Sequence, residues 1–123
     1  MGDRALVIFH DDDRVSPTVY LHWDGSRVPE RLEQLKNRME GRENDADYAA
    51  ARFIGICHEH IPGNLSLGVF GNRYTLAELK NGSRLAEASH GDAGVIVVNT
   101  KDFHWRAYGG YLTSHKATKK AAA

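Results

Sequence analysis

A short apolar run, Val95-Ile96-Val97-Val98, constrains the fold of this chain more than any other feature of its sequence. Gly94 and Asn99 bound the run, which therefore has the length of a strand rather than that of a helix. A strand without polar positions is suited to burial on both of its sides. The run predicts a strand in the middle of a sheet.

Four other segments have the composition or alternation of strands. Residues 4–9 form a β-branched and aromatic run, and residues 18–23 alternate apolar and polar side chains. Because these two runs are close in sequence, they favour an antiparallel hairpin. Residues 65–70 and 103–108 predict two further strands, each followed by a glycine-containing turn.

Two segments have helical periodicity. Apolar residues recur at steps of four, three and four between Val28 and Met39, which predicts a helix from Pro29 to Gly41 with Ser26 as its cap. A second helix is expected from Asn44 to Ile61, with Cys57 on its apolar side.

Residues 73–90 leave two alternatives open. Thr75 and Glu78 have the spacing of a capping box, which favours a short helix, and Ser83 could start another through Ala88. The segment 73–79 could equally return as a hairpin strand.

These elements predict an α+β fold, in which an antiparallel or mixed sheet of about five strands packs on two main helices in the order ββααβ(α)ββ. A chain of 123 residues allows one domain, which we place at residues 1–113, followed by a flexible basic and alanine-rich tail at 114–123. The residues expected to be mostly buried are Leu6, Ile8, Leu21, Leu32, Leu35, Phe53, Ile56, Ile96 and Val98.

Charge and cysteine content narrow the classes of partner and compartment. Sixteen basic and sixteen acidic residues give a net charge of zero, so nucleic acid is an unlikely partner. No apolar run approaches the roughly 20 residues of a membrane-spanning helix. Cys57 is the single cysteine and cannot form an intramolecular disulfide. The amino-terminal residues lack the apolar stretch of a secretory signal, so we expect a cytoplasmic protein.

The sequence contains no motif of known catalytic mechanism. The nucleophile motif GxSxG and the phosphate-binding motifs GxGxxG and GxxxxGK[ST] do not occur. Seven histidines are present, but Cys57, His58 and His60 diverge around a helix, and no histidine pair has the i, i+4 spacing of a helical metal site. We therefore expect no cofactor and no metal.

A candidate binding face comes from a repeated triplet. An apolar residue, a histidine and a tryptophan follow one another at positions 21–23 and again at 103–105. If the two strands were neighbours in register, His22 and His104 would lie about 5 Å apart, on the face opposite the helices. The alternative is two exposed histidines without a function. The side chains of this face are Tyr20, His22, His104 and Arg106.

An acidic turn follows the first strand at Asp11, Asp12 and Asp13. Carboxylates suit Mg²⁺ or Ca²⁺, but the glycine and the distal glutamate of a calcium loop are absent. The turn is expected instead at the rim of the binding face, where it could meet a basic partner.

These features favour a small non-enzymatic protein–protein interaction module, such as an inhibitor, an antitoxin or a phage-encoded regulator. The alternative is a small metal-dependent hydrolase or nuclease that uses His10, the acidic turn, His22 and His104. A third hypothesis, a nucleic-acid binder, would rest on the tail lysines Lys116, Lys119 and Lys120.

Overall fold

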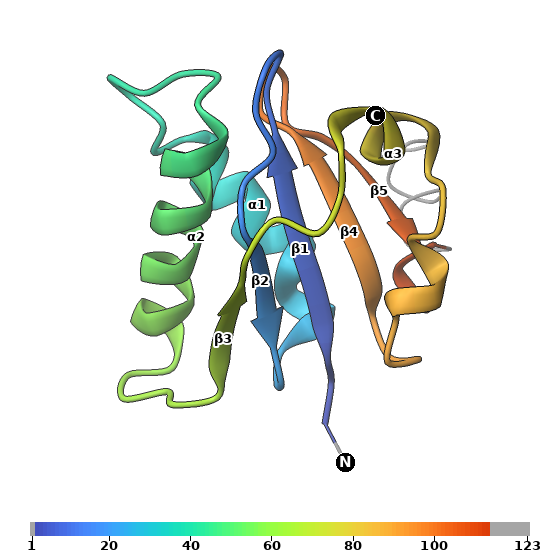
Figure 1. Ribbon diagram of the computed structural model, residues 1–123. Helices are drawn as coiled ribbons and strands as arrows, with labels where there is room; N and C mark the ends of the chain where they lie inside the picture. The colour runs from blue at the N-terminus through green and yellow to red at the C-terminus, as the bar shows by residue number, and fades with distance from the viewer. Residues whose placement is uncertain (1, 114–123) are drawn as a thin grey trace.

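The computed structural model describes residues 2–113, which form one five-stranded sheet with α-helices on both of its faces (Figure 1). The strands lie in the order β3-β2-β1-β4-β5, and β1 and β4 are the only parallel neighbours among the described strands. The chain therefore has the predicted α+β fold with a mixed sheet. The predicted tail, 114–123, lies outside the described residues. The strands are β1 (Ala5–His10), β2 (Thr18–Leu21), β3 (Leu67–Phe70), β4 (Gly94–Asn99) and β5 (His104–Tyr108).

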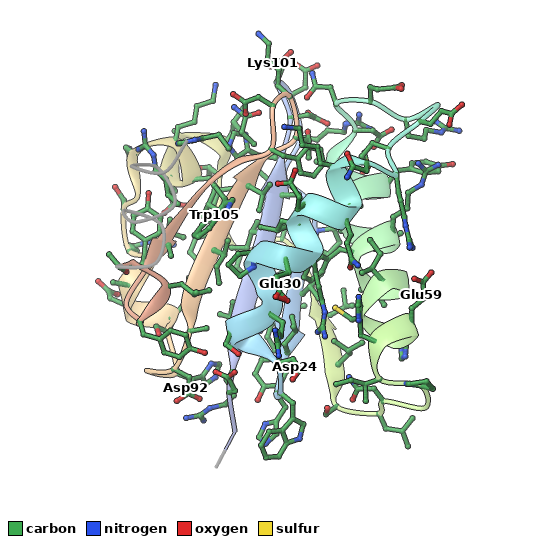
Figure 2. All side chains as sticks on the ribbon, turned by 180° about the vertical axis from the view of Figure 1, so that it is seen from behind. Asp24, Glu30, Glu59, Asp92, Lys101 and Trp105 are labelled. Atoms are coloured by element: carbon green, nitrogen blue, oxygen red, sulfur yellow. The ribbon has the colours of Figure 1, made fainter. Side chains whose placement is uncertain are left out.

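The two main helices, α1 (Val28–Lys36) and α2 (Ala46–His60), cover one face of the sheet. Figure 2 shows this side, with Glu30 and Glu59 on the helices and Trp105 on β5. A third helix, α3 (Leu76–Asn81), lies against the opposite face, near a short 3-10 turn at Ala86–Ala88.

The apolar run Val95–Val98 lies within β4, an interior strand that is buried on both faces. β4 pairs with β1 on one side and with β5 on the other, but the central strand of the sheet is β1. All six residues of β1 are buried, so β1, like β4, is covered on both faces of the sheet.

The larger core lies between the sheet and helices α1 and α2. Phe9 of β1 meets Phe53 of α2 edge to face, with ring centroids 5.6 Å apart, and Leu35 of α1 is fully buried. Every residue expected in the core is buried: Leu6, Ile8, Leu21, Leu32, Leu35, Phe53, Ile56, Ile96 and Val98.

A second core lies on the opposite face, which the sequence analysis had left open to solvent. Leu79 of α3 and Leu85 cover the apolar side chains that β1 and β4 present there, namely Leu6, Ile8, Val95 and Val97. The two strands are apolar on both sides and water cannot cover them. The two-sided burial expected of residues 95–98 is therefore confirmed, and only part of this face is left for a partner.

The helix ends differ in detail from the sequence prediction. Helix α1 ends at Lys36 rather than near Gly41, and Ser26 does not cap it. Helix α2 begins at Ala46 rather than at Asn44, and its cap is Asp45, whose side chain accepts a hydrogen bond from the Tyr48 N–H. The capping box of Thr75 and Glu78 is present, and the helical alternative for this segment is correct.

Among the helices that residues 2–113 form, none combines the length and the apolar character needed to cross a membrane.

Candidate functional site

The predicted binding face is divided into two separate ends. Strands β2 and β5 are separated by β1 and β4, so His22 and His104 are not neighbours. Three strand spacings of about 4.8 Å place these two histidines at least ~14 Å apart. The pairing expected from the repeated triplet was therefore wrong, because triplet similarity carries no information about strand order.

Tyr20 and His22 belong to an aromatic cluster near the amino end of β1. The Tyr20 hydroxyl lies 2.8 Å from His22 Nδ1, and its ring lies 6.1 Å from that of Phe70 and 5.4 Å from that of His90. Tyr20 is half-buried against the second core. Its ring therefore stabilises the fold in addition to bordering the surface.

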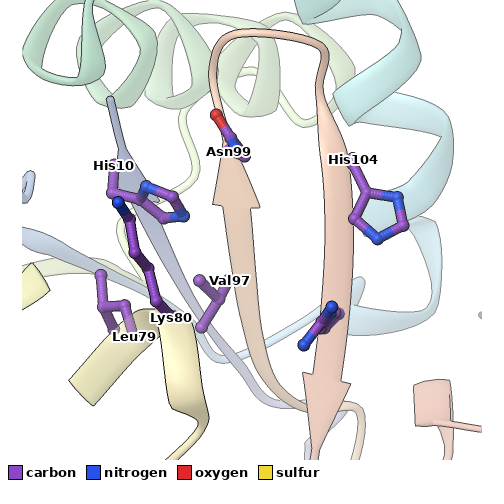
Figure 3. A pocket seen from close by; sticks show the side chains of 7 residues that line it. His10, Leu79, Lys80, Val97, Asn99 and His104 are labelled. Atoms are coloured by element: carbon purple, nitrogen blue, oxygen red, sulfur yellow. The ribbon is translucent and has the colours of Figure 1, made fainter. Parts of the chain in front are cut away.

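His104 and Arg106 line a hollow of about 210 Å³ at the other end of the face (Figure 3). The strand register places His10 beside Asn99 and Asn99 beside His104, so these three residues form a row across β1, β4 and β5. Lys80 reaches the hollow from α3. The remaining lining residues are Leu79 and Val97.

Sequence reasoning found His104 and Arg106, and its hydrolase alternative grouped His10 with His104, but it missed that Lys80 and Asn99 share their site. The missing information was the parallel register of β1 and β4, which brings the ends of two strands almost ninety residues apart to the same place. His10 and Asn99 each end an apolar run, and this position was the signal that the sequence offered.

The acidic turn has a structural role at its first residue. The Asp11 carboxylate is 4% exposed and accepts hydrogen bonds from the N–H groups of Asp13, Arg14 and Ala46, at 2.8, 2.7 and 3.0 Å. Burial raises the pKa of Asp11, but these hydrogen bonds and the Arg14 charge outweigh it, so the pKa lies below its ordinary value.

Asp11 therefore connects the β1–β2 turn to the first residue of α2, and it is not available to a partner. Asp12 and Asp13 are exposed, as expected for a turn at the rim.

Within residues 2–113, no three histidine, cysteine or acidic side chains lie close enough together to hold a metal ion. His58 and His60 are exposed at the end of α2, while Cys57 faces the core, as the helical spacing predicted. Burial raises the pKa of the Cys57 thiol to about 11, which makes it a poor nucleophile near neutral pH. Of the histidines named in the hydrolase alternative, His22 lies apart from His104, because β1 and β4 separate their strands.

The β3 edge of the sheet is exposed and apolar. Val69 in this strand is 56% exposed, and Leu65, two residues before it begins, is 96% exposed. Trp23, the last apolar residue of the alternating segment 18–23, lies two residues beyond β2 and is 49% exposed, although the alternation predicted that it shares the buried face of Leu21. No charged residue occurs from Ile61 to Asn72.

The opposite edge, β5, differs in two respects. Its outward side chains include a charged residue, Arg106, and the Thr113 hydroxyl donates a 3.2 Å hydrogen bond to the Ala107 carbonyl of this strand. Charges and covering segments are common devices that keep an edge strand from pairing with other chains. β3 itself contains no charged residue, and the charge nearest to it in the following sequence is Arg73, whose guanidinium lies 4.5 Å from the centre of the Phe70 ring.

Comparisons of the chain with family models, with curated proteins and with solved structures found no match.

Proposed function

We propose that the protein is a protein–protein interaction module that binds an extended segment of another protein along the outer edge of β3. The observation that carries the proposal is this edge strand, which contains no charged residue and has Val69 exposed on it and Leu65 exposed just before it. An incoming strand would pair with the main-chain groups of β3 and bury these apolar side chains.

The location of the exposed apolar side chains favours this edge over other surfaces. Tyr48 and Tyr111 are also exposed, but each has a polar environment: two arginines approach the Tyr48 ring, and the Tyr111 hydroxyl donates to Asp3. Leu65 and Val69 lie in a segment, residues 61–72, that contains no charged residue.

The proposal places the module in the cytoplasm, because its one cysteine, Cys57, is a buried thiol. Small inhibitors, antitoxins and phage-encoded regulators act by binding in this way, and we propose a role of that kind. The partner is another protein rather than a nucleic acid, since the chain has a net charge of zero.

A pair of variants at position 69 tests the proposal. Val69→Lys places a charge on the edge, whereas Val69→Thr keeps a β-branched residue of similar shape and serves as the control. We expect wild type and Val69→Thr to co-purify with the same partner protein, and Val69→Lys to lose it by at least about tenfold.

Two results would contradict the proposal. Equal recovery of the partner by Val69→Lys would place the interface elsewhere on the molecule. A stable dimer of the purified chain in sedimentation, dissociated by Val69→Lys, would assign the edge to a second copy instead of a different protein.

A further inference from the structure

The hollow beside α3 lies where the two parallel strands end. β1 ends at His10 and β4 ends at Asn99, and the chain leaves them in opposite directions, toward β2 and β5 respectively. In sheets with parallel strands, ligands bind in the crevice outside the carboxyl ends at such a point. This position is independent of the β3 edge, which lies on the other side of the sheet.

The lining of the hollow carries basic groups without an acidic counterpart. Lys80 and Arg106 are cations, His10 and His104 are imidazoles, and none of the seven described residues that line the hollow is Asp or Glu. Because the whole chain has a net charge of zero, this excess of basic groups is local.

Arg106 differs from the nine other arginines of the chain, all of which are among the described residues. Each of the nine contacts a carboxylate, a backbone carbonyl or an aromatic ring, whereas Arg106 has no ion pair, hydrogen bond or ring contact from its side chain to any described residue. The nine are Arg4, Arg14, Arg27, Arg31, Arg38, Arg42, Arg52, Arg73 and Arg84.

The size of the hollow limits the ligand to a small group. The hollow has a volume of about 210 Å³. Pockets that enclose drug-sized ligands begin at about 300 Å³. A single anionic group fits, and any larger molecule that carries this group would extend outside the hollow.

We propose that this hollow binds a phosphate group, either as inorganic phosphate or as the end of a phosphate monoester. A guanidinium binds two phosphate oxygens in parallel, and Lys80 adds an ammonium donor from the facing helix. The Asn99 amide supplies a further donor beside a tetrahedral group. A carboxylate has only two oxygens and would meet fewer of these donors.

His10 is the buried member of the row, with 6% of its surface exposed. Its Nδ1 lies 3.3 Å from the Asp11 carbonyl oxygen, which can only accept a hydrogen bond. Nδ1 therefore carries a proton, and Nε2 of the neutral ring is an acceptor that can receive the hydrogen of a protonated phosphate oxygen. The fixed ring supports a site that exists before the ligand arrives.

NMR titration of the full chain with small anions tests this assignment. The probes are inorganic phosphate, O-phosphoserine, adenosine monophosphate and, as a planar anion, acetate, at constant ionic strength. We expect saturable shifts of the Arg106 Nε–H and Asn99 N–H signals with the phosphate-containing probes. The probe with the lowest dissociation constant shows whether the hollow binds free phosphate or the phosphate group of an ester.

Two variants distinguish specific binding in the hollow from long-range electrostatic attraction by the positive charges of the protein. Arg106→Gln should weaken phosphate binding at least about tenfold, since a hydrogen bond to a charged group contributes about 1.5–3 kcal/mol. Lys101→Gln removes an exposed cation of the β4–β5 turn outside the hollow, and it should weaken binding less than about twofold.

The proposal is overturned if none of the phosphate probes gives saturable shifts at millimolar concentration, or if acetate binds as tightly as phosphate. Equal effects of Arg106→Gln and Lys101→Gln would also overturn it, because the hollow would then contribute no specific contact. The co-purification variants at Val69 do not affect this titration, so the two proposals can fail separately.

Discussion

Replacement of Asp11 by Asn should destabilise the fold, although the residue lies in a turn of three aspartates. One carboxylate oxygen accepts from the N–H groups of Asp13 and Arg14, and the other accepts from the Ala46 N–H and from Arg14 Nε at 3.0 Å each. An asparagine keeps one acceptor oxygen and turns the other position into a donor, which opposes the N–H groups on that side.

The structure sets the magnitude of this effect. A buried N–H left without an acceptor costs about 1–3 kcal/mol, and the loss of a negative charge at the amino end of α2 costs a further ~0.3–1 kcal/mol. We therefore expect Asp11→Asn to lower the free energy of unfolding by roughly 1.5–4 kcal/mol. Asp13→Asn is the control, because it removes the same charge from an exposed neighbour. It should change the free energy of unfolding by less than about 0.5 kcal/mol.

Urea denaturation of the three proteins at neutral pH measures both differences, provided that the slopes of the transitions agree. Repetition at lower pH adds a second check, because the pKa of Asp11 is lowered in the folded protein. The stability that this lowered pKa provides is present at pH values above the pKa of Asp11 in the unfolded chain, about 3.9. It is lost as the pH falls through the lower pKa of Asp11 in the folded protein. A loss below about 0.5 kcal/mol for Asp11→Asn at neutral pH would refute the structural role of this carboxylate.

Three further predictions concern the core and the backbone. Phe53→Ala should lower the free energy of unfolding by about 3–5 kcal/mol in urea, and a loss below about 1 kcal/mol would contradict its packing against Phe9. Cys57 should react with iodoacetamide far more slowly in native protein than in urea at pH 8, since its pKa is about 11; equal rates would show that the thiol is accessible. Gly94→Ala should destabilise the protein by more than about 1 kcal/mol, because Gly94 has φ +108° and an added Cβ would lie 2.5 Å from the Tyr108 carbonyl oxygen. Gly55→Ala should instead stabilise the protein by about 0.5–1 kcal/mol, because an added Cβ at this position of α2 meets open space. Thermal melts rank both glycine variants against wild type, and the opposite order would contradict these backbone arguments.

Local patterns predicted most of the elements because each pattern has a local cause. The apolar run of β4, the periodicity of α1 and α2 and the capping box before α3 depend on neighbouring residues alone. The boundaries were less accurate where the backbone takes a positive φ. Phe103, at φ +60°, is such a position, and β5 begins one residue after it.

Strand order could not be predicted in the same way, because it depends on contacts between distant residues. The triplets at 21–23 and 103–105 look alike, yet β1 and β4 lie between their strands. The parallel pairing of β1 with β4 has no local signal, and it alone brings His10 to Asn99. The hollow was consequently found only in part from the sequence.

The acidic turn illustrates a different limit. Three consecutive aspartates are equivalent in the sequence, but the fold buries Asp11 at the start of α2 and leaves Asp12 and Asp13 exposed. Trp23 shows the same limit, since its alternation with Leu21 continues past the end of β2, where the sheet no longer buries it. Pattern alone does not indicate where a strand ends.

Site-specific photo-crosslinking tests the proposed interaction along the β3 edge most directly. A photoreactive phenylalanine analogue at position 69 reports on the edge, and the same analogue at position 30 reports on the exposed surface of α1 (Figure 2). We expect irradiation in cells to give a discrete adduct from position 69, heavier than the 13.7 kDa chain by the mass of one partner, and none from position 30. Adducts that are equally frequent at both positions, or absent from position 69, would contradict the proposal.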